Sequence, residues 1–168
     1  YIVTKANPGL LTITDGDISK YVELKPTDVE KTYDGQPHAT GTATATDANN
    51  NVIKIEYSVD GVNWTTDPAE ITAKNVSEIT VKVRASAENY TGHVYGEQKL
   101  TINPRKVTLK SETDSKEYDG TPLTRPDVTV TGDGFVDGEV SDIKATGSVT
   151  YVDEGSVKNT IEYTENEG

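Results

Sequence analysis

Lys31-Thr32-Tyr33-Asp34-Gly35-Gln36-Pro37 recurs 85 residues later as Lys116-Glu117-Tyr118-Asp119-Gly120-Thr121-Pro122. A second pair of segments, VELK at 22–25 and VTLK at 107–110, repeats with the same offset of 85. Two separate matches in one register argue against chance, and a fixed period is the signature of tandem structural modules. We assign a structural role to eight residues of the repeated motif: Tyr33, Asp34, Gly35, Pro37, Tyr118, Asp119, Gly120 and Pro122.

A third match has a different offset. Residues 1–14 (YIVTKANPGLLTIT) resemble residues 90–103 (YTGHVYGEQKLTIN) at an offset of 89, which aligns Leu11 with Leu100 and Ile13 with Ile102. The later copy closes a module, whereas the first copy precedes one. The repeats therefore predict four parts, in chain order: residues 1–14, the terminal strand of a preceding or partner-chain module; residues 15–19, a turn-rich linker; residues 20–104, a complete β-module; and residues 105–168, a second, C-terminally incomplete β-module.

The hydrophobic pattern predicts an all-β chain. Apolar and polar residues alternate along many short runs, as in Ile53–Tyr57 and Val81–Ala85, which is the period of half-buried strands. Turn signals such as Asp60-Gly61 separate these runs. Short strands with frequent turns favour small antiparallel β-sandwich modules of the immunoglobulin-like (Ig-like) kind, arranged serially in an elongated array. A β-grasp-like module with a short helix is the alternative.

Charge and composition exclude several classes of partner. The 168 residues include 28 acidic and 16 basic side chains, for a net charge of −12, and neither Cys nor Met. An acidic chain repels phosphate backbones and anionic lipid, and no apolar run approaches the ~18 residues of a membrane span. We therefore expect no nucleic-acid partner and no membrane insertion. No nucleophile or phosphate-loop motif is present, so we predict neither an enzyme nor a cofactor.

Two places are candidates for binding. Asp47, Asn49 and Asn51 have the oxygen-ligand spacing that opens a calcium loop, but Ser58 stands where the closing acidic ligand would fall, so a hairpin loop is the competing interpretation. Trp64, the only tryptophan, is either a platform that stacks on a sugar ring or a cap on the hydrophobic core.

The motifs of the second module resemble a known family of repeats. The Lys-x-Tyr-Asp-Gly-x-Pro motif is followed by GDGFVDGE at 132–139, GSVT at 147–150 and GSVKNTI at 155–161, while the first module ends in Asn89-Tyr90 and LTIN at 100–103. This pattern is similar to the MBG-type and related bacterial Ig-like repeats of Gram-positive surface proteins. The resemblance implies an exported, cell-wall-attached, adhesin-like protein on the outside of the cell, in which such modules form a stalk.

Three functions follow as hypotheses. The first is a non-catalytic structural stalk whose partners are neighbouring modules of the same array. The second is a module that binds a host glycan or glycoprotein through Trp64 and the loop 47–51. The third is a filament subunit, in which residues 1–14 of one chain complete the module 105–168 of an identical chain by strand addition, with Leu11 and Ile13 as the inserted apolar side chains.

Overall fold

The described chain is all-β. The computed structural model describes residue 2 and residues 4–166, and strands make up 45% of it against 5% in helical turns. These turns are three-residue 3₁₀ segments, so no described residue belongs to an α-helix: η1 (Ile18–Lys20), η2 (Pro68–Glu70) and η3 (Val152–Glu154). The alternative of a β-grasp module with a short helix is therefore wrong for these residues. None of these helical segments has the length or the apolar character needed to cross a membrane.

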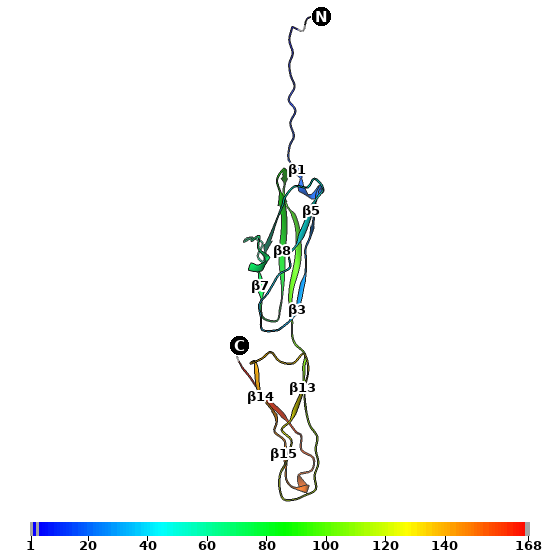
Figure 1. The fold of residues 1–168 in the computed structure, drawn as a ribbon, viewed down its shortest axis with the longest axis vertical. Coiled ribbons are helices and arrows are strands. Elements are labelled where there is room, and N and C mark those ends of the chain that lie inside the picture. The colour runs from blue at the N-terminus through cyan, green and yellow to red at the C-terminus, as the bar shows by residue number, and fades with distance from the viewer. Residues whose placement is uncertain (1, 3, 167–168) are drawn as a thin grey trace. The chain divides into compact units, whose positions relative to one another are not determined.

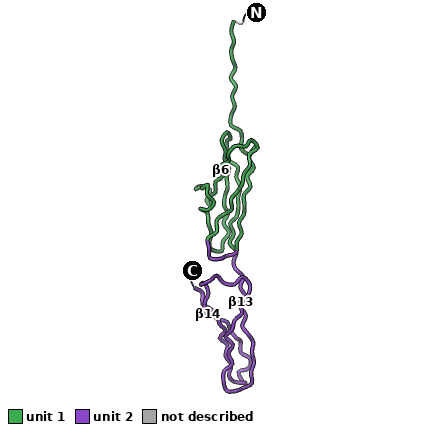
Figure 2. Tube along the Cα trace, in the orientation of Figure 1, with its two compact units in different colours: residues 1–31, 37–102 green, residues 32–36, 103–168 purple. Residues whose placement is uncertain are grey.

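The chain divides into two compact units, coloured separately in Figure 2. Unit 1 comprises residues 1–31 and 37–102, and unit 2 comprises residues 32–36 and 103–168. The boundary near residue 103 lies beside the end that the internal repeats predicted for the first module. The short loop 32–36, which carries the first copy of the repeated motif, belongs by its contacts to unit 2.

Unit 1 is built on a four-stranded sheet that three small strand pairs accompany (Figure 1). The order in the large sheet is β3 (Val29–Thr32), β10 (Val94–Asn103), β8 (Ser77–Ala87) and β6 (Ile53–Ser58), and β8 is antiparallel to both of its neighbours. The small pairs are β2 (Val22–Lys25) with β5 (Thr44–Asp47), β4 (His38–Ala39) with β7 (Thr72–Ala73), and β1 (Gly16–Asp17) with β9 (Tyr90–Thr91).

The core of unit 1 lies between the four-stranded sheet and the β2–β5 pair. On β8, Val81, Val83 and Ala85 are fully buried, whereas Lys82 between them is exposed, as the alternating pattern predicted. Leu24 of β2 packs against both clusters of buried side chains. Gly96 of β10 permits this approach, because a Cβ atom at that position would lie 2.7 Å from Cγ of Pro26.

Residues 15–19 differ from the linker that the sequence predicted. Gly16 and Asp17 form β1, which pairs in parallel with β9. Ile18 is 1% exposed and packs with Val22 and Ala85 in a cluster of the unit 1 core. The composition of this segment is typical of a turn, and its single apolar residue gives no periodic signal of a buried strand. Because that residue is buried in the core, residues 16–18 belong to unit 1.

Unit 2 repeats the strand pairing of unit 1. In register, β11 (Val107–Ser111) pairs with β13 (Val128–Gly132) as β2 pairs with β5, since Leu109 faces Val130 and Leu24 faces Ala45. The other pairs of unit 2 are β12 (Leu123–Thr124) with β15 (Ser148–Val149), and β14 (Val140–Ala145) with β16 (Ile161–Glu165). At the offset of 85, β12 aligns with β4, and β14 and β16 overlap β6 and β8, whereas β15 aligns with residues 63–64 and not with β7. The contacts between pairs also recur, because β11 touches β16 as β2 touches β8.

One part of the repeat has no counterpart among the described residues of unit 2. At the offset of 85, β3 corresponds to residues 114–117, which form no strand, and no described strand follows β16 as β10 follows β8. Unit 2 therefore has the pairs of the repeat without the β3–β10 pairing that completes the large sheet of unit 1. Among the described residues, its only buried apolar side chain is Ala145, which is 6% exposed.

Candidate functional site

A groove lies in unit 2. It has a volume of about 610 Å³ and its walls come from three segments of the chain. The first wall is 111–118, which contains the counterpart of β3, and the others are 147–152 and 155–159, with Leu123 and Arg125 between them. We call this hollow the unit 2 groove.

One wall of the unit 2 groove leads into β16, an edge strand among the described residues. In unit 1, β8 has β6 on one edge and β10 on the other, and β10 in turn has β3 beside it. In unit 2, β16 pairs with β14, and no other described strand pairs with β16. An unpaired edge of this kind presents free backbone donors and acceptors.

Asn159 holds the walls of the groove together. Its Nδ2 donates to the carbonyl oxygens of Glu112 at 3.0 Å and Arg125 at 2.9 Å, and its Oδ1 accepts from the backbone N–H of Gly147 at 3.0 Å. The Ser111 hydroxyl donates to the carbonyl oxygen of Asn159 at 2.8 Å. One half-buried side chain thus fixes three segments while the groove between them stays open.

A residue of β10 makes the same bridge in unit 1. Gln98 accepts from the backbone N–H of Thr27 at 3.0 Å and donates to the carbonyl oxygen of Gly41 at 2.6 Å and to the Thr40 hydroxyl at 2.8 Å. Residues 27 and 40 become 112 and 125 at the offset of 85, which are the two carbonyls that Asn159 binds. In unit 2 the bridging amide therefore comes from the wall of the groove, and it binds carbonyl oxygens at both positions, whereas Gln98 binds the N–H of Thr27 and the hydroxyl of Thr40.

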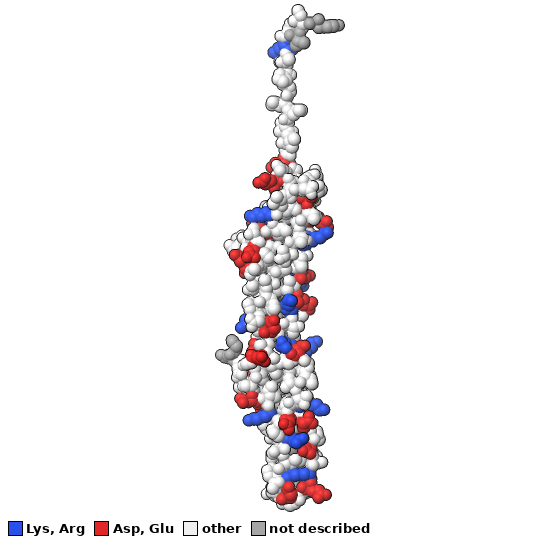
Figure 3. Space-filling model, viewed as in Figure 1, with Lys and Arg blue, Asp and Glu red and all other residues white. Residues whose placement is uncertain are grey.

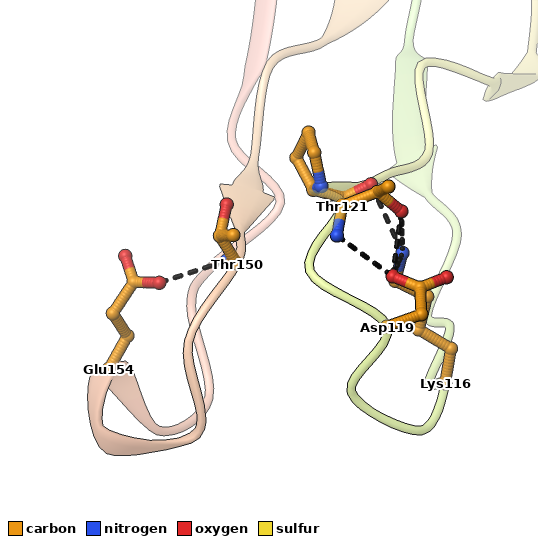
Figure 4. Close-up of polar contacts among 6 residues, drawn as sticks. Lys116, Asp119, Thr121, Thr150 and Glu154 are labelled. Atoms are coloured by element: carbon orange, nitrogen blue, oxygen red, sulfur yellow. Dashed lines mark hydrogen bonds and ion pairs between the residues drawn. The ribbon is translucent and has the colours of Figure 1, made fainter.

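Two loops with defined polar contacts stand near the groove (Figure 4). Lys116 Nζ donates to Asp119 Oδ1 at 2.8 Å and to the Thr121 hydroxyl at 2.7 Å. The hydrogen bond from Lys116 is the largest cause that holds the pKa of Asp119 well below its ordinary value. In the other loop, Glu154 accepts from the backbone N–H groups of Tyr151 and Thr150, which lowers its pKa.

The groove is lined by aromatic and apolar side chains as well as by charges. Tyr118 and Tyr151 are about 60% exposed, and their ring centroids lie 6.5 Å apart. Leu123 and Val149 are half-buried in the lining, and Val157 is exposed. The charged lining residues balance, with three acidic and three basic side chains: Glu112, Asp114, Glu117, Lys116, Arg125 and Lys158. Such a lining suits an uncharged, partly apolar chain segment better than a charged small molecule.

The repeated Tyr-Asp-Gly motif forms the same turn in both places. Asp34 Oδ1 accepts from the backbone N–H of Gln36, and Asp119 Oδ1 accepts from that of Thr121, each at 2.9 Å. Gly35 and Gly120 have φ angles of 75° and 79°, a region that favours glycine. Pro37 and Pro122 follow, each directly before a short strand, β4 or β12.

The two tyrosines of the motif have different partners. The Tyr33 hydroxyl donates to Glu139, which lies in the same unit, and this hydrogen bond raises the pKa of Tyr33. Tyr118 instead lies beside Tyr151 at the groove. The turn therefore has the same geometry in both copies of the motif, whereas the tyrosine ring has different contacts in each copy.

The three candidate calcium ligands come together around a tyrosine hydroxyl. Tyr90 donates to Asp47 Oδ1 at 2.8 Å and accepts from the side-chain amides of Asn49 at 2.8 Å and Asn51 at 3.2 Å. The other oxygen of Asp47 accepts from the backbone N–H and the side-chain amide of Asn51. Burial tends to raise the pKa of Asp47, but the hydrogen bonds from Asn51 and Tyr90 outweigh it and lower that pKa. These contacts are those of a loop closed on Tyr90.

Trp64 is half-buried, and a cation covers one face of its ring. The Arg84 guanidinium lies 4.1 Å from the ring centroid, and Arg84 Nε donates to Glu56 at 2.8 Å. The indole N–H donates to the carbonyl oxygen of Gly61 at 3.2 Å. The contacts of Trp64 are thus with its own hairpin and with β8 of the large sheet.

Leu11 and Ile13 lie in a segment without strand partners. Figure 1 shows no strand arrow before β1, and among the described residues of 4–14 neither residue contacts a buried cluster. Their exposed fractions are 102% and 101%, against 0% and 1% for Leu100 and Ile102, to which the repeat aligns them. The Leu-Thr-Ile sequence therefore has buried apolar side chains at 100–102 and exposed ones at 11–13.

Sequence reasoning did not identify Asn159, Tyr151 and Glu154 as residues of a site. Asn159 falls within the GSVKNTI stretch at 155–161, to which the family resemblance gave no role, and Tyr151 and Glu154 lie in no motif that the sequence offered. Comparison with models of known protein families, with curated proteins and with solved structures finds no match to this chain.

Proposed function

We propose that the chain is a non-catalytic run of MBG-type, bacterial Ig-like modules that act as a structural stalk of an exported Gram-positive surface protein. One observation carries the proposal: the sequence repeat at offset 85 is also a repeat of strand register, from β2–β5 to β11–β13. Identical register in this strand pair of the two units is what tandem modules of a single fold lead one to expect.

The packing of unit 1 supports a sandwich as the module fold. The β2–β5 pair lies over the face of the large sheet that carries Val81 and Val83, and both layers contribute to one core. The recurrence of the β11–β16 contact in unit 2 extends this interpretation to the second module. Polar and charged residues cover the outer surface, with both signs interspersed in the face drawn in Figure 3, which suits a solvent-exposed spacer.

X-ray scattering tests the stalk. A spacer requires its modules to extend along one direction, so we expect a radius of gyration well above the ~15 Å of a compact globule of this length. The variant Leu11→Asp/Ile13→Asp provides the matched sample, because both side chains are exposed and the substitutions suppress any association through them. A radius near ~15 Å for both samples would contradict the spacer.

The proposed location has its own test. Antibodies raised against the 168-residue chain are expected to label intact, unpermeabilised cells of the source organism, and mild protease treatment of those cells should abolish the labelling. Labelling that requires permeabilised cells would refute an exported stalk while leaving the module fold intact.

A further inference from the structure

The chain enters and leaves unit 1 near opposite ends of β10. Gly16 and Asp17 of β1, the first described residues to pair with another strand, lie beside residues 90–91, shortly before β10 begins. Unit 1 ends at Ile102, next to the last residue of β10. Tension between these two points runs along β10 and pulls its C-terminal end outward, so the contacts of β10 with the rest of unit 1 oppose the sliding of this strand.

The backbone ladder of β10 does not by itself prevent sliding. β10 is antiparallel to β8 over residues 94–102, and an antiparallel ladder repeats every two residues. A shift of β10 by two residues therefore restores the ladder over most of its length and keeps the same side chains on the buried face. The register under tension must be fixed by a side chain that differs from those two residues away.

Gln98 differs from its neighbours in this way. It is polar and 1% exposed, whereas Leu100 and Ile102, the next two residues on the same face, are apolar and equally buried. Gly96, two residues before it, has no side chain. A buried amide is stable only where hydrogen-bond partners meet it, so the position of Gln98 along the strand is specific.

The partners of Gln98 come from two segments that are distant in sequence. Its Oε1 accepts from the backbone N–H of Thr27 at 3.0 Å. Its Nε2 donates to the carbonyl oxygen of Gly41 at 2.6 Å and to the Thr40 hydroxyl at 2.8 Å. Residue 27 precedes β3, and residues 40–41 lie between β4 and β5, so one side chain joins β10 to both connections.

The backbone around Gln98 leaves no room for another side chain or for water. A Cβ atom on Gly41 would lie 2.1 Å from the carbonyl oxygen of Thr27, and a Cβ atom on Gly96 would lie 2.7 Å from Cγ of Pro26. The described residues include no buried side-chain nitrogen or oxygen without a partner. Because water does not reach these hydrogen bonds, they break only when the segments separate.

Sliding β10 by two residues breaks these hydrogen bonds without a substitute. The shift moves Gly96 to the place of Gln98. The N–H of Thr27 and the carbonyl group of Gly41 then face a residue without a side chain and stay buried without a partner. The shift also moves the Gln98 amide to the place of Leu100, which is fully buried among apolar groups. The ladder recovers after the slip, whereas the contacts of Gln98 do not.

We propose that Gln98 fixes the register of β10 under tension and thereby sets the rate at which unit 1 unfolds when the chain is pulled. Residues 26–27, 40–41 and 96–98 form this device, which we call the Gln98 junction. Its biological use rests on the proposed stalk, since a stalk bears tension. Its mechanical role is a property of unit 1 alone, so scattering or surface labelling can refute the stalk without affecting the junction.

Single-molecule force spectroscopy of the full chain tests the proposal. The chain contains no cysteine, so Thr14→Cys and Pro104→Cys, both at exposed positions, place unique handles on either side of unit 1. Gln98→Leu nearly keeps the size of the side chain but removes the amide. At one fixed force it should raise the unfolding rate at least ~10-fold, because the native junction loses the hydrogen bonds that must break in the transition state.

Tyr57→Phe is the matched control. It also deletes a buried hydrogen bond, which the backbone N–H of Ala43 donates at 2.9 Å, but Tyr57 belongs to β6 and has no part in the junction. A contact that is still formed in the transition state does not affect the unfolding rate, so this variant should stay within about threefold of the parent at the same force.

The direction of pulling separates a mechanical role from simple stabilisation. With handles at Thr14→Cys and Val62→Cys, the tension reaches the exposed hairpin after β6 and does not draw β10 along its axis. The effect of Gln98→Leu on the unfolding rate should then fall to about threefold or less. A contact that merely stabilises the fold would give the same effect in both directions.

Three results would overturn the proposal. These are a folded Gln98→Leu chain that unfolds at the parent rate under tension along β10, an equal effect in both pulling directions, and an effect of Tyr57→Phe as large as that of Gln98→Leu. If Gln98→Leu does not fold, Thr40→Val replaces it, since it removes one hydrogen bond of the junction at nearly constant shape. It should raise the rate along β10 about threefold, and an unchanged rate would count against the junction.

Discussion

Unit 1 and unit 2 share a repeat, a strand register and a turn motif, yet they bury very different amounts of apolar surface. Of the eleven apolar side chains that are buried among the described residues, Ala145 is the only one in unit 2. In unit 1, β8 alone buries Val81, Val83 and Ala85, whereas Tyr163 of β16 in unit 2 is 49% exposed. The comparison shows that a shared turn and a shared pairing of two strands do not by themselves produce a buried core, because burial depends on which side chains meet in space.

The largest expected effect compares the two copies of the Leu-Thr-Ile sequence. Leu100→Ala should destabilise unit 1 by about 2–5 kcal/mol, since it leaves a cavity at a fully buried site. Leu11→Ala removes the same atoms from an exposed site and should change unfolding by less than about 0.5 kcal/mol. Urea denaturation followed by Trp64 fluorescence reports on unit 1 alone, because it contains the only tryptophan. Equal effects of the two substitutions would remove the distinction between the copies.

A smaller effect on the stability of unit 1 is expected from removing the buried hydroxyl group of Tyr57. Tyr57 is 2% exposed, and its hydroxyl accepts from the backbone N–H of Ala43 at 2.9 Å. Tyr57→Phe leaves that N–H buried without a partner and should cost about 1–3 kcal/mol. Tyr95→Phe is the control, since Tyr95 is 66% exposed, and it should be neutral within about 0.5 kcal/mol. A neutral Tyr57→Phe in the same fluorescence assay would show that this part of the core admits water.

The smallest effect concerns the turn beside the groove and its response to pH. The folded-state pKa of Asp119 lies below its unfolded value, so the stabilisation from its ionised form is complete above pH ~3.9 and is lost as the pH falls toward the folded pKa. Lys116→Ala removes the largest cause of the shift, and the pKa should rise toward its ordinary value. An NMR titration of the Asp119 carboxyl carbon measures this rise. Lys110→Ala, outside the turn, should leave the titration unchanged, and an unmoved pKa in Lys116→Ala would assign the shift to Thr121 alone.

Much of the fold was predictable because it depends on local patterns. Alternation along residues 81–85 predicted a strand buried on one face, and the repeated Asp-Gly predicted two turns of the same geometry. The linker prediction failed at Ile18, because one apolar residue in a polar segment has no period to reveal its burial. The groove was not predictable, since Asn159 acquires its role from the carbonyl groups of Glu112 and Arg125, which are distant in sequence and meet it only in the fold.

The sequence by itself determined that this protein is all-β, that it repeats at an offset of 85, and that residues 1–14 copy a strand that closes a module. These properties reside in the spacing of residues along the chain, and spacing can be read without coordinates. Only the tertiary structure decided that Leu100 is buried while Leu11 is exposed, and that Asn159 links the carbonyl groups of Glu112 and Arg125. Burial and hydrogen bonding depend on which segments meet in space, and identical sequences acquire different surroundings when one has neighbours on both edges and the other has none.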